Sequence, residues 1–296
     1  MNGHPHADRR QVLAGSLAAL ATLAAGCAAA STPTAGPAGR RLAPQPSHRP
    51  RPHLLAATTD PKVIASRARV PVLCWHQLRD WHPGDAGYAR RLLICPPAVF
   101  RAQLDALSAA GYSTITADQY LAHLTTGAGL PPRPVLLSFD DSQPSQINEG
   151  LPQLARRSMT ATFFVMTVVL GKPGWMTRDD LRRLDAAGMS VAAHTWDHHR
   201  ADRYTPADYP VQFDQPRALL EKVLAKPVRH FAYPYGAWNS RGFAPLHAAG
   251  YATAFQLSDK AMDPRAPLHT LRRILVNSTW TRQDLLARLQ SIPAPA

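Results

Sequence analysis

Short apolar or β-branched runs alternate with segments of helical periodicity along the chain from residue 70 onward. Continuous apolar runs are typical of strands that are buried on both faces of a parallel sheet. The pattern predicts strands at residues 70–75, 113–116, 135–139, 161–167, 190–193, 228–233, 253–257 and 274–277. It predicts helices at residues 97–110, 117–125, 177–187, 206–224, 241–249 and 281–289, with Thr116 as an N-cap.

Seven or eight strands separated by helices predict an α/β protein. Two architectures fit this alternation, a parallel (β/α) barrel and an open doubly wound sheet, and the strand spacing does not separate them. No glycine-rich phosphate loop follows any predicted strand, so the sequence gives no support for nucleotide binding.

Residues 1–30 have the charged, apolar and small-residue regions of an export signal. Arg9 and Arg10 resemble a twin-arginine motif, and the segment that ends at Cys27 resembles a lipobox in which Leu23 lies one position early. We therefore expect an exported protein. It is either a lipoprotein anchored through Cys27 on the extracellular face of the cell membrane, or a secreted protein cleaved nearby.

Residues 31–61 are rich in Pro, Ala, Ser and Thr and have no apolar period. Such a segment cannot bury enough apolar surface to fold, so we expect a disordered tether that leads into a catalytic domain at residues 62–296. Beyond Cys27, the chain has two cysteines, Cys74 and Cys95. In an exported domain they form either one disulfide or two separate buried thiols.

A formal net charge of +13 over 296 residues favours anionic partners such as nucleic acid or a cell envelope. The chain has no zinc-finger spacing, no RNA-binding aromatic signature and no basic helix with interleaved aromatic residues. We therefore expect no nucleic-acid partner and interpret the charge as general surface charge. We expect membrane contact only through the N-terminal signal or its lipid anchor.

Asp140 and Asp141 follow the most apolar run of the chain, residues 135–139. Active sites of parallel α/β proteins lie at the carboxyl ends of strands, and adjacent carboxylates buried there require a cation or a proton. The alternative is a helix N-cap, because a helical stretch follows Asp141. The pair alone does not decide between these interpretations.

His194, His198 and His199 follow the predicted strand at residues 190–193. Two histidines at positions i and i+4 can bind one metal ion if the chain turns helically between them. With Asp141 they give three ligands and leave an open position for water, which is typical of catalytic zinc sites. The alternatives are an exposed histidine cluster and a site in which His199 replaces His198.

Three motifs carry a family resemblance: Ser138-Phe-Asp-Asp-Ser142, His194-Thr-Trp-Asp-His198 and Phe231-Ala-Tyr-Pro-Tyr235-Gly236. In this order they resemble the polysaccharide deacetylase family, carbohydrate esterase family 4, also known as the NodB homology domain. The signatures of that family read Thr-Phe-Asp-Asp-Gly, His-Ser/Thr-x-x-His and Arg-x-Pro-Tyr. The resemblance covers residues 70–276 and implies a distorted (β/α) barrel of seven or eight mainly parallel strands.

Carried over by position, the resemblance implies that Asp140 is the general base of a hydrolase. It implies that Asp141, His194 and His198 bind a divalent metal, with zinc preferred. The backbone N–H of Tyr235 matches the family residue that helps to form the oxyanion hole. The implied reaction is hydrolysis of N-acetyl groups on a sugar polymer.

Three positions depart from the family pattern. Ser142 replaces the glycine of the first motif, which matters if that position needs a positive φ. Ala232 replaces the arginine that orients the base, and Arg273 is the candidate substitute. As the general acid we prefer His76 to His269, because His76 resembles a Tyr-His phrase of the branch that acts on exported poly-β-1,6-N-acetylglucosamine.

Four tryptophans lie near these motifs or in loops, and we expect at least one of them to stack on a sugar ring. They are Trp75, Trp175, Trp196 and Trp238. The expected function is metal-dependent removal of N-acetyl groups from N-acetylglucosamine-containing polysaccharide of the cell envelope or biofilm matrix. The alternatives are an O-acetyl polysaccharide esterase that uses the same site, and a carbohydrate-binding module that has lost its catalytic activity.

Overall fold

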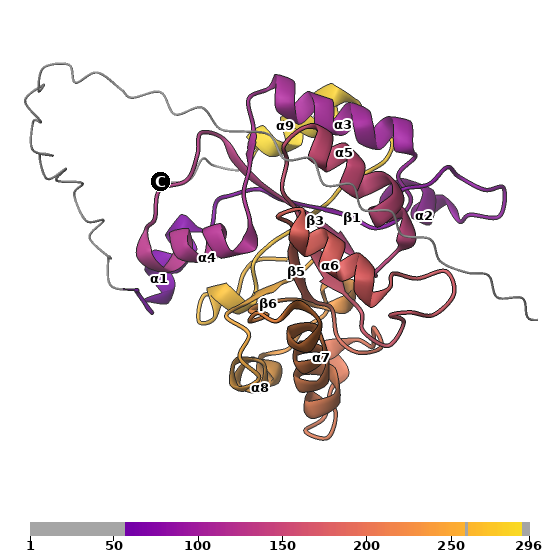
Figure 1. Ribbon diagram of the computed structural model, residues 1–296. Helices are drawn as coiled ribbons and strands as arrows, with labels where there is room; N and C mark the ends of the chain where they lie inside the picture. Colours follow the sequence, from indigo (N-terminus) through magenta and orange to yellow (C-terminus); the bar gives the residue numbers. More distant parts are fainter. Residues whose placement is uncertain (1–56, 258–259, 292–296) are drawn as a thin grey trace, which may run out of the picture. The chain divides into compact units, whose positions relative to one another are not determined.

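The computed structural model describes residues 57–257 and 260–291 (Figure 1). Eight strands lie within these residues, and each overlaps one predicted strand. They are β1 (Val72–Trp75), β2 (Ser113–Thr114), β3 (Pro134–Asp140), β4 (Thr162–Val165), β5 (Ser190–Ala193), β6 (His230–Ala232), β7 (Thr253–Phe255) and β8 (Ile274–Leu275).

Every strand pairing in the described part of the chain is parallel. Seven strands run in the order β7-β6-β5-β4-β3-β1-β8, and β2 pairs with β3 outside this order. Between the two end strands there is an isolated bridge that joins Phe255 of β7 to Leu271, which precedes β8. The sheet is therefore a half-barrel, and the expected distorted (β/α) barrel of seven or eight parallel strands is confirmed.

Helices cover the outside of this sheet, and most of them begin and end close to the predicted positions. They are α1 (Pro61–Arg67), α2 (Gly87–Leu92), α3 (Pro97–Ala109), α4 (Ala117–Thr126), α5 (Leu151–Arg156), α6 (Arg178–Ala186), α7 (Gln215–Leu224), α8 (Phe243–Ala248) and α9 (Arg282–Gln290). Capping boxes at Thr116, Thr177 and Thr281 start α4, α6 and α9. In Figure 1, α3 packs beside α9 and α6 packs beside α7.

On the face of the sheet that α3 covers, a stack of aromatic rings lies below the carboxyl ends of three neighbouring strands. Phe139 of β3 stacks on Trp75 of β1 and on Phe163 of β4, with ring centroids 5.8 and 4.8 Å apart. All seven residues of β3 are buried, as a continuous apolar run predicts. This packing fixes the position of Asp140, the last residue of β3.

The predicted helix at residues 206–224 is divided into a π-helical turn, Pro210–Asp214, and α7. A second π-helical turn, Gln146–Gly150, precedes α5. Both α-helices have a proline near their start, Pro152 and Pro216, which lacks the N–H that a regular i→i−4 bond needs. Periodicity predicts the helix but not this local change of winding.

The fold begins ahead of the expected domain boundary at residue 62. The N–H of Thr58 donates to the carbonyl of Thr125 at 2.7 Å, and Asp60 caps α1, whose first residue is Pro61. The export signal, Cys27 and the tether up to residue 56 lie outside the described residues. None of the helices within residues 57–257 and 260–291 has the length and apolar character needed to span a bilayer.

Cys74 and Cys95 are both buried as free thiols. Of the two alternatives that the sequence left open for these cysteines, the structure therefore has two separate thiols rather than a disulfide.

Candidate active site

The polar motifs meet at the carboxyl edge of the sheet, where parallel strands end together. Asp140 ends β3, and Asp141 starts the loop that follows. His76 follows β1, His194 follows β5, and Tyr235 lies in the loop after β6. The fold therefore brings the predicted site residues from four strands to one edge.

Three side chains at this edge direct their ligand atoms toward one another. The Oδ1 of Asp141 lies 3.3 Å from the Nε2 of His194 and 3.1 Å from the Nε2 of His198. The ligand atoms of all three lie within 4.8 Å of one another. His199 is largely exposed, and its Nδ1 pairs with Asp197 at 2.8 Å. The geometry thus places His198, rather than His199, in the cluster.

The surroundings of His194 and Asp141 fit a bound cation. Nδ1 of His194 lies 2.8 Å from the carbonyl oxygen of Ala232, so this nitrogen carries the hydrogen and Nε2 keeps its lone pair. Oδ1 of Asp141 is buried and makes no hydrogen bond of good geometry, although two imidazole rings face it. Two imidazole nitrogens and one carboxylate oxygen suit zinc and similar divalent ions.

Asp140 is held by a two-pronged ion pair with Arg273, and both side chains are fully buried. Nη1 donates to Oδ1 at 2.6 Å, and Nη2 donates to Oδ2 at 2.7 Å. Burial would raise the pKa of Asp140, but the positive charge and hydrogen bonds of Arg273, together with the nearby His194 and His76, hold the pKa below its ordinary value. The carboxylate is therefore ionised at neutral pH, as a general base requires.

Arg273 makes the contact that the family motif assigns to the missing arginine. Position 232 is alanine, and its backbone carbonyl accepts the hydrogen bond from Nδ1 of His194. Arg273 reaches Asp140 from the segment before β8, and its Nε donates to the carbonyl of Gln256 at 3.1 Å. The expected substitute is therefore the residue that holds the base.

Of the two candidates for the general acid, His76 lies beside the base and His269 lies elsewhere. Nε2 of His76 is 4.0 Å from Oδ2 of Asp140, and its buried Nδ1 has no hydrogen-bond partner. His269 packs against the rings of Phe243 and His247. Burial lowers the pKa of His76, which makes the protonated ring a stronger acid. The geometry therefore favours His76.

Gln146 is a buried residue of this site that the sequence analysis does not identify. Its side-chain amide donates to the carbonyl oxygens of both His76, which directly follows β1, and Asp140, which ends β3. One amide group thus ties together the ends of β1 and β3. Its position in the π-helical turn after Asp141 gave no sequence signal stronger than that of any polar helix residue.

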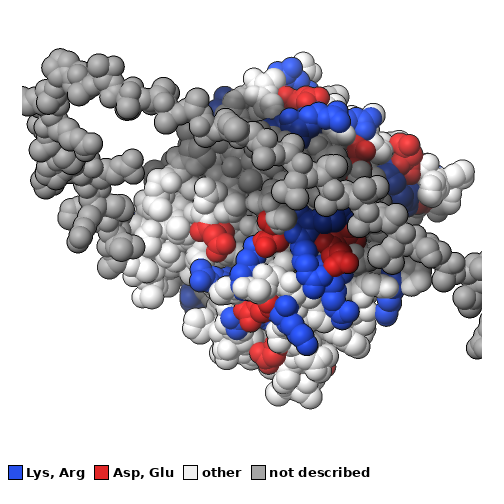
Figure 2. Space-filling model, in the orientation of Figure 1, with Lys and Arg blue, Asp and Glu red and all other residues white. Residues whose placement is uncertain are grey.

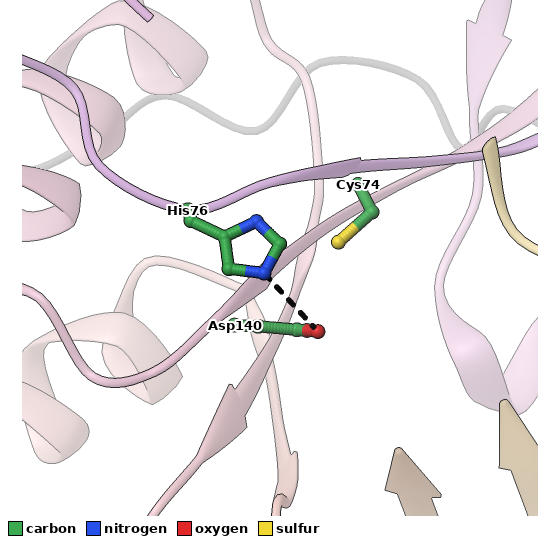
Figure 3. Close-up of side chains that lie close together, drawn as sticks. All are labelled: Cys74, His76 and Asp140. Carbon is green, nitrogen blue, oxygen red and sulfur yellow. Dashed lines mark ion pairs between the residues drawn. The ribbon is translucent and has the colours of Figure 1, made fainter. Parts of the chain in front are cut away.

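Cys74, His76 and Asp140 form a second group of potential metal ligands (Figure 3). His76 faces Asp140 in this view, and the thiol of Cys74 lies beside them. However, Nη1 of Arg273 contacts both Cys74 Sγ, at 3.5 Å, and Asp140. A guanidinium at this point repels a cation. Burial also raises the pKa of Cys74 well above its usual value, so the thiol stays protonated and this group does not fit a metal.

The site motifs contain a cluster of left-handed backbone conformations, which are uncommon outside glycine and concentrate at functional sites. The residues and their φ angles are Asp141 (76°), Ser142 (59°), Thr195 (66°), His198 (68°) and Tyr235 (59°). The left-handed turn at Tyr235 leaves its side chain 61% exposed, with the ring edge-on to His198 at a centroid distance of 4.7 Å.

An open cavity of about 440 Å³ adjoins the histidine cluster. It is lined by His198, His199, Arg200, Arg203, Tyr204, Asp208, Gln212 and Tyr235. The cavity gives a substrate access to the cluster from the side of β5 and β6.

The four tryptophans expected near the site have different environments. Trp75 is a core residue, and its indole N–H donates to Gln103. Trp238 is half-buried and packs against Phe243. Trp175 is also half-buried, whereas Trp196 is 37% exposed. Trp196 therefore has the most open surface of the four for contact with a sugar.

Comparison with known proteins agrees with this fold. Residues 127–254 match the family model described as polysaccharide deacetylase. YxkH of Bacillus subtilis, whose name describes it as a polysaccharide deacetylase, is 23% identical over 225 residues, which cover 76% of this chain and 77% of YxkH. The poly-β-1,6-N-acetyl-D-glucosamine N-deacetylase of Staphylococcus aureus is 23% identical over 192 residues, which cover 60% of this chain and 66% of that protein.

Two solved structures share the half-barrel. The deacetylase PplD of Streptococcus pyogenes, in complex with acetate, has a TM-score of 0.69 and 23% identity, covering 76% of this chain and 98% of PplD. IcaB from Ammonifex degensii has a TM-score of 0.62 and 26% identity, covering 75% of this chain and 97% of IcaB. These comparisons show that residues 127–254 match a polysaccharide deacetylase domain and that the chain shares the half-barrel fold of the two solved structures.

Proposed function

We propose that this protein is a metal-dependent N-deacetylase of polysaccharides that contain N-acetylglucosamine. One observation carries the proposal: the ligand atoms of Asp141, His194 and His198 lie within 4.8 Å of one another, next to the buried pair of His76 and Asp140. A cation site with three protein ligands and an adjacent base is the arrangement that hydrolysis of an amide requires.

The metal would be held by Asp141, His194 and His198, with zinc preferred, although cobalt and nickel suit the same ligands. When bound, it would supply a Lewis acid for the amide carbonyl and for the attacking water. The hydrogen bond from His194 Nδ1 to Ala232 fixes the ring that presents Nε2.

Asp140 would remove a proton from the water as the oxygen bonds to the carbonyl carbon. The backbone N–H of Tyr235 would stabilise the negative charge that develops on the carbonyl oxygen. His76 would donate a proton to the nitrogen as the carbon–nitrogen bond breaks, leaving acetate and a free amine on the sugar. Arg273 keeps Asp140 ionised and oriented through both carboxylate oxygens.

The names of the relatives support a substrate of linked N-acetylglucosamine, with the β-1,6-linked polymer as the first to test. The export signal expected at residues 1–30 supports a place outside the cell, on the membrane surface or secreted, where such polymers occur. On the face in Figure 2, basic and acidic side chains are intermixed rather than separated into one basic surface. This mixture supports an uncharged sugar polymer rather than nucleic acid as the partner.

The test is acetate release by the purified full chain from β-1,4- and β-1,6-linked N-acetylglucosamine oligomers, with O-acetylated xylan as the ester substrate. We expect release from an N-acetylated oligomer that a chelator abolishes and zinc restores. The variant Asp140→Asn should lose activity by about 10³-fold while its metal content is unchanged. Release from xylan alone would instead identify an esterase.

Stoichiometric metal binding without release from any substrate would contradict the proposed reaction. If the protein neither released acetate nor bound metal, the alternative of a carbohydrate-binding module without catalysis would take its place. Equal turnover by Asp140→Asn would remove Asp140 from the role of base.

A further inference from the structure

The described residues include four large apolar side chains that are exposed to solvent. They are Trp81 (42%), Tyr88 (60%), Trp196 (37%) and Tyr235 (61%). Single exposed aromatic residues are ordinary on protein surfaces. All four of these, however, lie in segments that follow the carboxyl end of a strand: Trp81 and Tyr88 follow β1, with Tyr88 in α2, and Trp196 and Tyr235 follow β5 and β6.

These aromatic residues lie on both sides of the catalytic carboxylates. Trp196 and Tyr235 follow β5 and β6, whereas Trp81 follows β1. In the sheet, β3 with Asp140 stands between β4 and β1, so β5 and β6 are on one side of it and β1 is on the other. A long ligand that crosses the edge over Asp140 therefore meets aromatic surface before and after the reacting centre.

Trp81 belongs to an excursion of the chain at residues 77–95, between β1 and α3, that includes α2 (Figure 1). The excursion is braced internally. Arg79 donates two hydrogen bonds to Asp85, both at 2.8 Å, and the indole N–H of Trp81 is shared between the carbonyls of Arg90 and Ile94 at 3.1 and 3.2 Å. The indole is thus held by its polar atom while much of its surface stays open.

The excursion is also fastened to the catalytic edge at more than one point. The N–H of Leu78 donates to Ser145 Oγ at 2.9 Å in the loop after β3, and the N–H of Ser278, after β8, donates to the carbonyl of Arg91 at 2.7 Å. Its first residue, Gln77, directly follows His76. Trp81 is therefore set on the β1 side of the site before any substrate arrives.

We propose that Trp81 forms a remote sugar-binding subsite, which stacks on a ring of the polymer several units away from the acetyl group that is removed. This inference rests on the proposed function and specifies its substrate: an extended glycan that occupies the edge on both sides of Asp140, rather than a monosaccharide or a chain end. The indole face suits the apolar face of a pyranose ring. Arg79 is paired with Asp85, so its charge does not compete for the ligand beside Trp81.

The test compares N-acetylglucosamine disaccharide with hexasaccharide as substrates of the wild-type chain and of Trp81→Ala. We expect Trp81→Ala to raise KM for the hexasaccharide by about tenfold, because a stacked ring loses its aromatic partner. Its kcat on both substrates and its KM for the disaccharide should stay near the wild-type values. Trp81→Phe should restore most of the loss, and His82→Ala, an exposed neighbour in the same excursion, is the matched control.

Hexasaccharide binding to the metal-free wild-type and Trp81→Ala proteins provides a readout that needs no turnover. Weaker binding by Trp81→Ala supports the subsite even if no oligomer releases acetate, an outcome that would count against the proposed deacetylation alone. Equal hexasaccharide KM and equal binding by the two proteins would overturn the subsite while leaving deacetylation intact. A loss of the same size in His82→Ala would also overturn it, since the effect would then come from the loop as a whole.

Discussion

Buried histidines at the two edges of the sheet differ in whether their ring nitrogens have hydrogen-bond partners. At the amino edge, His230 begins β6 and both of its ring nitrogens have partners, Thr253 Oγ1 at 2.8 Å and Asp118 Oδ1 at 3.2 Å. At the carboxyl edge, the Nδ1 of His76 has no partner, and the Nε2 of His194 faces carboxylates. Satisfied polar groups stabilise a fold, whereas a group kept free is available for chemistry.

Backbone conformation separates the same two edges. Five of the eight non-glycine residues with positive φ in the described chain lie in the motif loops of the carboxyl edge. The other three, Arg133, Ser158 and Ala225, precede strands at the opposite edge or end a helix. Strain held at a functional edge must be offset by packing elsewhere. We therefore expect substitutions at the carboxyl edge to change activity, and those at the amino edge to change stability alone.

The largest effect is expected from Arg273→Met, which leaves the buried Asp140 without its partner. Removing one member of a buried ion pair destabilises a protein by roughly 3–5 kcal/mol. We also expect kcat to fall at least about 100-fold, because the base loses its orientation and its ionised state. Chemical denaturation and steady-state kinetics measure the two effects.

The pH dependence of this destabilisation gives a sharper test than its size. In the wild type, Arg273 lowers the pKa of Asp140, so the stability from this group is present above the unfolded pKa near 4 and is lost as the pH falls through the lower folded value. In Arg273→Met, burial raises that pKa, so protonation on acidification relieves the unpaired charge. The difference in the free energy of unfolding between the metal-free wild type and metal-free Arg273→Met should therefore become smaller as the pH falls from about 7 to about 5. A constant difference would indicate lost packing instead of lost charge.

A smaller effect of a different kind is expected from His230→Leu at the amino edge. The substitution leaves the buried hydroxyl of Thr253 without its partner, which costs roughly 1–3 kcal/mol of folding stability. Because this edge takes no part in the proposed reaction, kcat/KM and metal affinity should match the wild type. Thermal denaturation and acetate release check both statements. A tenfold loss of kcat/KM with an intact fold would contradict the inference that the amino edge takes no part in the reaction.

Much of this fold follows from the sequence, because buried parallel strands produce continuous apolar runs. The runs predicted all eight strands, and the motif order predicted which strand ends would meet. The helix α2 in the excursion that contains Trp81 was not predicted, because it has no buried residue and so no apolar period. The excursion is held by side-chain bonds to backbone carbonyls, which leave no pattern in the sequence.

The candidate site shows the same limit more sharply. The motifs predicted that Asp141, His194 and His198 bind one metal ion, and the structure places their ligand atoms within 4.8 Å of one another. The contact between Arg273 and Asp140 spans 133 positions and was reached only by asking what could replace a missing arginine. No departure from a motif pointed to Gln146. In the sequence, a glutamine whose amide donates to two backbone carbonyls cannot be told apart from any other glutamine.

The smallest and most local prediction concerns Ser142, where the family motif has glycine. Its φ of 59° shows that this position does need a positive φ, which costs a residue with a side chain about 1 kcal/mol. The Ser142 hydroxyl offsets this strain, because it accepts from the N–H of Met166 at 3.0 Å and thereby joins the motif loop to the end of β4.

Ser142→Gly relieves the strain and loses that bond, so its stability should lie within about 1 kcal/mol of the wild type. Ser142→Ala loses the bond and keeps the strain, so it should be about 1 kcal/mol less stable than Ser142→Gly in urea denaturation. If Ser142→Ala is as stable as Ser142→Gly, the left-handed conformation carries no strain in solution. In that case, serine is tolerated at this turn because the conformation costs little, and the hydroxyl bond is not needed to offset strain.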